Sequence, residues 1–127
     1  MTKIYDLEDR TYSFAKTVRN YVALLPKTIA SIEDSKQLVR SSGSVAANYI
    51  EANEALSKKD FVMRIKICRK EAKETILWLR LLNSDERLIK ESTELMKIFG
   101  SILENSKGLF EFMICLVFRN SDLGFYL

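Results

Sequence analysis

QLVRSSGSVAANYIEA, residues 37–52, is the stretch that decides the fold. Its four small residues at 41–44 could belong to a flexible linker, a phosphate-binding loop or a helix with little side-chain bulk. Steps of four and three residues, the spacing of one helical face, connect Leu38, Ser42, Val45, Tyr49, Ala52 and Leu56. We therefore interpret the stretch as the middle of a helix that begins between Ser31 and Ser35.

The small residues also predict a close contact between helices. Gly43 inside a helix costs up to about 1 kcal/mol relative to alanine, and the expected gain is tight approach of a neighbouring backbone. The positions with little side chain are Ser42, Gly43, Ala46 and Ala47. A phosphate-binding loop is not indicated, because the Gly-Lys-Ser/Thr sequence of such loops is missing.

The same periodicity predicts three more helices, at about residues 7–25, 57–83 and 87–106. We expect Asp6 to cap the first helix and Pro26 to end it. Ser57 should cap the third helix, and Lys107-Gly108 should end the fourth. The residues expected to face the core are Leu7, Thr11, Phe14, Val18, Tyr21 and Leu25 in the first helix, Phe61, Ile65, Cys68, Ala72, Ile76 and Leu79 in the third, and Leu88, Leu95, Phe99 and Ile102 in the fourth.

Four long helices joined by short loops predict an all-α protein, an antiparallel up-down-up-down four-helix bundle. We expect the bundle to span residues 1–106 and an apolar C-terminal tail to span 107–127. Residues 109–118, LFEFMICLVF, are apolar at nine of ten positions. Their aromatic and β-branched content favours an extended segment, packed on the bundle or on a neighbouring subunit, with membrane association as the alternative.

Composition argues against several classes of function. The chain has no histidine, which removes the commonest general base and metal ligand. Its two cysteines, Cys68 and Cys115, are far apart, so neither a metal site nor a disulfide framework is indicated. No signal peptide and no membrane-length apolar run is evident. We expect a cytoplasmic protein that is not an enzyme and that binds no cofactor, metal or membrane.

Charge is concentrated in residues 57–82, which hold eight Lys or Arg and three acids. At about 100° per residue, five of these cations fall within one stripe, away from the expected core face. A row of cations is the pattern of a nucleic-acid-binding surface, although a solvated helix face has the same appearance. The predicted nucleic-acid-binding residues are Lys59, Lys66, Lys70, Lys73 and Arg80.

A second group of residues could join copies of the chain. Ile67 and Trp78 lie on a flank of the third helix, and tryptophan is enriched at protein interfaces. Trp78 could instead close the end of its own bundle. Asn48 and Glu51 flank the second helix, where they could hydrogen-bond to the third helix or across a subunit boundary. These four residues are the predicted oligomer interface.

Three stretches together resemble a known family. They are LEDRTYSFAKTVRNYVALLPK at 7–27, QLVRSSGSVAANYIEA at 37–52 and SKKDFVMRIKICRKEAKETILWLRLL at 57–82. Their order and spacing resemble the four-helix bundle proteins encoded in intervening sequences of bacterial 23S rRNA genes. That family is similar in fold to an accessory protein of diversity-generating retroelements, a basic pentameric barrel that binds nucleic acid and a reverse transcriptase.

The resemblance implies a homopentameric ring, with Asn48 and Glu51 as signature residues of fold or assembly. It supplies no catalytic residue. Our leading hypothesis is a ring-forming bundle that binds structured RNA, or an RNA–protein complex, through its basic helix face. The alternative is a protein–protein scaffold whose cations are only solvated surface.

Overall fold

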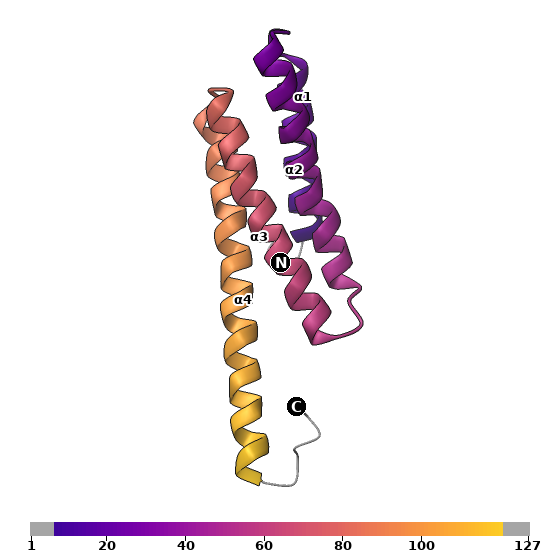
Figure 1. The fold of residues 1–127 in the computed structure, drawn as a ribbon, viewed down its shortest axis with the longest axis vertical. Helices are drawn as coiled ribbons and strands as arrows, with labels where there is room; N and C mark the ends of the chain where they lie inside the picture. The colour runs from indigo at the N-terminus through magenta and orange to yellow at the C-terminus, as the bar shows by residue number, and fades with distance from the viewer. Residues whose placement is uncertain (1–6, 121–127) are drawn as a thin grey trace.

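A computed structural model describes the backbone of residues 7–120 and the side chains of residues 7–106. The described chain consists of four α-helices and contains no strand. Consecutive helices run in opposite directions (Figure 1), which confirms the predicted all-α, antiparallel four-helix bundle. The helices are α1 (Leu7–Ala23), α2 (Ile29–Asn53), α3 (Lys58–Leu81) and α4 (Glu86–Asn120).

The helix starts follow from local hydrogen bonds. Ser57 caps α3 as predicted, since its hydroxyl accepts a 3.0 Å hydrogen bond from the Asp60 amide. α2 begins at Ile29, earlier than expected, because Thr28 and Ser31 form a reciprocal capping box with bonds of 3.1 and 3.0 Å. The predicted cap of α1, Asp6, lies outside the described residues.

Two predicted positions at helix ends are wrong. α2 ends at Asn53, so Leu56 lies in the following loop and is 99% exposed instead of facing the core. α4 continues to Asn120, through the predicted stop at Lys107-Gly108 and through the segment 109–118 expected to be extended. A single glycine costs a helix only about 1 kcal/mol, and strand propensity is a weak, context-dependent preference. The division between a bundle and a tail at residue 106 stays a prediction.

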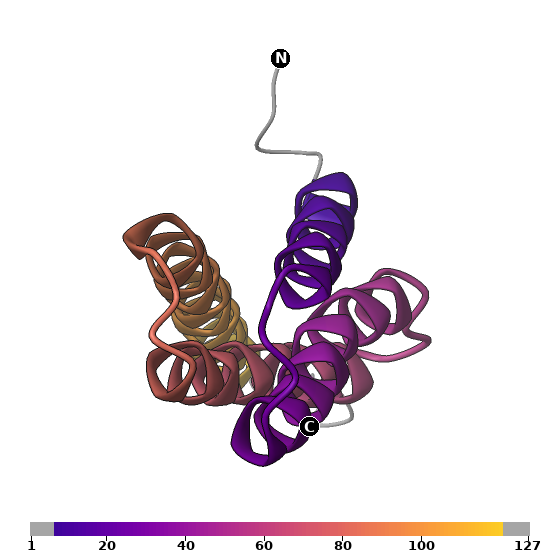
Figure 2. The same ribbon diagram turned by 90° about the horizontal axis from the view of Figure 1, so that it is seen from above.

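The core forms where the apolar stripes of the four helices meet. Of the predicted stripe residues with described side chains, all except Leu56 are buried or half-buried. The largest fully buried side chains include Leu38, Val45, Ile65, Leu79 and Phe99. α3 lies between α2 and α4, and α1 packs mainly on α2. Seen from above, α1 and α4 stand apart along one side of the bundle (Figure 2).

The predicted close backbone approach at Gly43 is wrong. A Cβ placed on Gly43 would lie 3.1 Å from Nη2 of Arg19, a side-chain atom of α1. Ala47, expected in the same contact, is exposed. Ser42, also expected in this contact, is fully buried, and so is the neighbouring Ser41.

Candidate nucleic-acid interface

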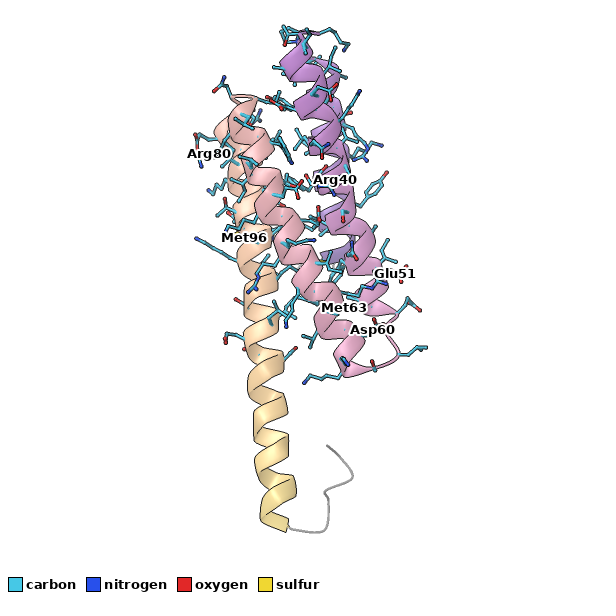
Figure 3. The ribbon with its side chains drawn as sticks, in the orientation of Figure 1. Arg40, Glu51, Asp60, Met63, Arg80 and Met96 are labelled. Carbon is cyan, nitrogen blue, oxygen red and sulfur yellow. The ribbon has the colours of Figure 1, made fainter. Side chains whose placement is uncertain are left out.

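Four predicted nucleic-acid-binding residues, Lys59, Lys66, Lys73 and Arg80, recur every seven residues along α3. Seven helical residues rise about 10.5 Å, so this cation row is about 31 Å long. All four side chains are exposed. Figure 3 shows Arg80 on the side of α3 away from α2, close to the helix C-terminus. Lys70 lies exposed beside the row, and a role of these five residues in binding nucleic acid stays a prediction.

No member of the row forms an ion pair with an acidic side chain among residues 7–106. Lys70 has one such contact, 3.6 Å from its Nζ to Oε2 of Glu71. Acidic neighbours therefore do not neutralise the row one for one. Unpaired cations along one line give that surface a positive potential, which attracts polyanions.

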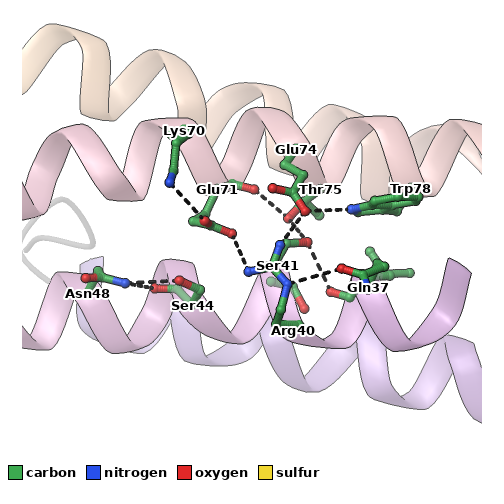
Figure 4. A network of polar contacts seen from close by, with 12 residues as sticks. Gln37, Arg40, Ser41, Ser44, Asn48, Lys70, Glu71, Glu74, Thr75 and Trp78 are labelled. Carbon is green, nitrogen blue, oxygen red and sulfur yellow. Dashed lines mark hydrogen bonds and ion pairs between the residues drawn. The ribbon is translucent and has the colours of Figure 1, made fainter. Parts of the chain in front are cut away.

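The acids of α3 are held on its other flank, toward α2. Arg40 of α2 donates to Oε1 of Glu71 at 3.1 Å and also to Oε2 of Glu74 (Figure 4). Trp78 donates its indole N–H to Oε2 of Glu74 at 2.9 Å. The Trp78 hydrogen bond and then Arg40 lower the pKa of Glu74 below its usual value. Two of the three acids of α3 thus pair with Arg40 of α2 and not with the cation row.

Buried hydroxyl groups fix α3 between its neighbours. Ser41 on α2 and Thr75 on α3 have their hydroxyl oxygens 2.8 Å apart, and Thr75 also donates to the Glu71 carbonyl. Ser92 on α4 donates to the Ala72 carbonyl at 2.8 Å. The spacing of apolar and small residues along the helices did not predict these contacts. A polar residue beside each stripe is the signal that could have revealed them.

The predicted interface residues lie in different environments. Asn48 is half-buried and accepts a 3.0 Å hydrogen bond from Arg64 of α3, the within-chain alternative. Trp78 packs against the core of its own bundle, while Ile67 is half-buried on α3. Glu51 is exposed. The structure thus brings Asn48 to α3 but leaves Glu51 apart, and a role for these residues between copies stays a prediction.

The described part of the chain holds no group of three or more residues suited to bind a metal. Cys68 is fully buried, and its burial raises the pKa of the thiol to about 12. A thiol with so high a pKa is a poor nucleophile. No helix in the described range is sufficiently long and apolar to cross a bilayer.

The fold defines a small helical-bundle protein whose α3 carries exposed cations without an acidic partner among residues 7–106. The chain belongs to the 23S rRNA-intervening sequence protein family, whose model matches residues 5–107. This match confirms the resemblance of the three sequence stretches.

A solved structure supports the same assignment. It is the 1.70 Å crystal structure of a protein of unknown function from the S23 ribosomal protein family of Bacteroides thetaiotaomicron VPI-5482. The two chains are 33% identical, and the match covers 76% of this chain and 96% of the other, with a TM-score of 0.67. No curated protein matches this chain.

Proposed function

We propose that the chain is a non-enzymatic, cytoplasmic RNA-binding protein that works as a homo-oligomer, with RNA lying along the cation row of α3. The observation that carries the proposal is the exposed, unpaired row of Lys59, Lys66, Lys73 and Arg80. The family description names 23S rRNA, which suggests RNA as the polyanion.

The expected mode of binding is electrostatic. Lysine and arginine side chains about 10.5 Å apart contact phosphates, which position a nucleic acid without reading its bases. Such contacts release counterions, so affinity falls steeply as salt is added. Several copies of the row in one oligomer would add their contacts and raise the affinity further.

The test is the salt dependence of binding to a short RNA duplex, followed by fluorescence anisotropy. Each phosphate contact contributes about 0.9 to the slope of log K against log salt. The variant Lys59→Gln, Lys66→Gln, Lys73→Gln should therefore lower the magnitude of the slope by about 2 to 3.

A matched control removes the same charge elsewhere. Arg87→Gln, Lys90→Gln and Lys97→Gln change three exposed cations on α4. This control should bind RNA with almost the slope of the unchanged chain. Equal slopes in both variants, or wild-type binding that does not respond to salt, would contradict the proposal.

A protein-binding scaffold is the second candidate. Three exposed apolar side chains on α3 favour it, namely Met63 at 46%, Leu77 at 47% and Leu81 at 53% exposure. Binding to RNA should then be absent, with a protein partner retained. For the oligomer itself, the resemblance implies five copies, and the mass in solution tests that number.

A further inference from the structure

The side of α3 opposite its core stripe carries a second seam, which is apolar at both ends and charged at its middle, where Lys70 and Glu74 lie. Its positions follow steps of four and three residues and lie opposite the core stripe of the same helix. Helical positions so spaced form one continuous face, as in coiled coils. This face is half open to solvent, unlike the core stripe. We define the α3 seam as Met63, Ile67, Lys70, Glu74, Leu77 and Leu81.

Another open apolar face lies where α1 packs on α2. Ile32, Val39 and Ile50 fall within about 20° of one another around α2, and Ile32 and Ile50 are 39% and 49% exposed. Tyr12 of α1 is 60% exposed and lies one turn after Glu8, which accepts a 2.8 Å hydrogen bond from Asn53 of α2. We call Tyr12, Ile32, Val39, Gly43, Ala46 and Ile50 the shoulder.

The two faces match in length. Met63 to Leu81 and Ile32 to Ile50 are each 18 residue steps, or about 27 Å of helix. The shoulder's own side chains are small at its middle, at Gly43 and Ala46, and the Arg19 guanidinium lies over Gly43. At one end it continues into a hollow of about 430 Å³ whose apolar walls include Val22, Leu25 and Val39. The hollow has room for a leucine side chain of the α3 seam.

Charge disfavours pairing of the α3 seam with itself. Lys66, Lys73 and Arg80 each immediately precede a seam residue, so two antiparallel α3 helices would place their cation rows side by side. Like charges flanking a helix pair destabilise it. The shoulder instead offers exposed cations, Arg19 and Lys36, to Glu74, whose two within-chain bonds both use Oε2.

We propose that the α3 seam of one copy packs on the shoulder of the next copy. The contact joins two different patches, so it repeats head to tail and generates a closed ring or a filament. The cation row lies beside this contact and stays open to solvent. Each added copy therefore adds one more cation row to the oligomer. The inference rests on the homo-oligomer part of the proposed function.

The experiment uses two full-length variants that each lose one face. Leu77→Glu with Leu81→Glu breaks the α3 seam, and Tyr12→Glu with Ile50→Glu breaks the shoulder. All four positions are exposed, so helical content and cooperative unfolding should persist. Light scattering after size exclusion should show each variant as a single chain, because every contact needs one of each face.

Mixing the variants supplies the decisive result. One intact seam and one intact shoulder should then meet, which gives a 1:1 complex of two chains and nothing larger. Leu56→Glu is the matched control, since Leu56 is 99% exposed and lies outside both faces. This control should keep the wild-type mass.

Three results would overturn the inference: a single-chain wild type, a shoulder variant that still associates, or a mixture without a complex. The RNA titration separates this failure from that of the proposed function. If the 1:1 complex forms but the wild type binds no RNA, only RNA binding fails. If RNA binds in a salt-dependent way without any complex, only the head-to-tail contact fails.

Discussion

Arg19 covers Gly43, and this contact decides how α2 responds to a side chain at position 43. Alanine at a helix interior is favoured over glycine by up to about 1 kcal/mol. The new Cβ would lie 3.1 Å from Nη2 of Arg19, the far end of an exposed, flexible side chain that can move. We expect Gly43→Ala to raise the free energy of unfolding by up to about 1 kcal/mol, measured by urea denaturation.

Gly100→Ala provides the matched comparison. Gly100 is also inside a helix, and its added Cβ would meet only Cδ of Arg69, at an ordinary 3.9 Å. The two alanine variants should gain similar stability. A loss of stability in Gly43→Ala that persists in an Arg19→Ala background would show that the helix is closely approached there after all.

At the scale of elements, the contact between α2 and α3 gives a dependence of stability on pH. The pKa of Glu74 is lowered in the folded chain, mainly by the Trp78 hydrogen bond and then by Arg40. A lowered folded-state pKa stabilises the fold above the unfolded value, and this contribution is lost as pH falls through the folded value. Acidification should therefore weaken the contact between these two helices.

Trp78→Phe removes the indole donor and tests this origin. Its unfolding free energy should fall less than that of the wild type between about pH 7 and about pH 3, because less carboxylate stabilisation is left to lose. Phe61→Leu is the control, since it also reduces a half-buried aromatic side chain of α3. If the unfolding free energy fell equally in Trp78→Phe and the wild type, the indole would not be what lowers the pKa of Glu74.

Periodicity along the sequence predicted the elements better than their ends or their polar contacts. The stripes of Leu38, Ile65 and Leu95 are buried as expected, because a helical face depends only on residue spacing. The start of α2 and the end of α4 depend on single caps and local propensities, which compete closely. Exposure of the cation row followed from the same geometry, whereas RNA binding stays a prediction.

The network of Arg40, Glu71 and Glu74 was outside the reach of sequence analysis. Arg40 is separated by 31 and 34 residues from its two partners. Whether they meet depends on the rotation of α2 and α3 about their own axes and on their relative height. Spacing within each helix does not determine either quantity, so only the packed bundle reveals the contact.

At the scale of the whole molecule, α1 is the least attached helix. It packs along α2 but meets α4 over only a short stretch. There Arg10 of α1 donates 2.8 Å hydrogen bonds to Glu91 and Glu94 of α4. The hydrogen bond to Glu91 raises the pKa of Arg10, so the cation is retained at every working pH. A groove bordered by Asn20, Tyr21 and Asp85 continues this open side.

A helix that packs mainly against one neighbour separates before the others. Local opening of the bundle should therefore begin with movement of α1 away from α4. Its amide protons should then exchange with deuterium sooner than those of α3, which is enclosed on two sides. Arg10→Ala should quicken exchange in α1 and leave α3 almost unchanged, as mass spectrometry of peptides would detect. Equal rates in both helices would mean that the four helices open only together, as one cooperative unit.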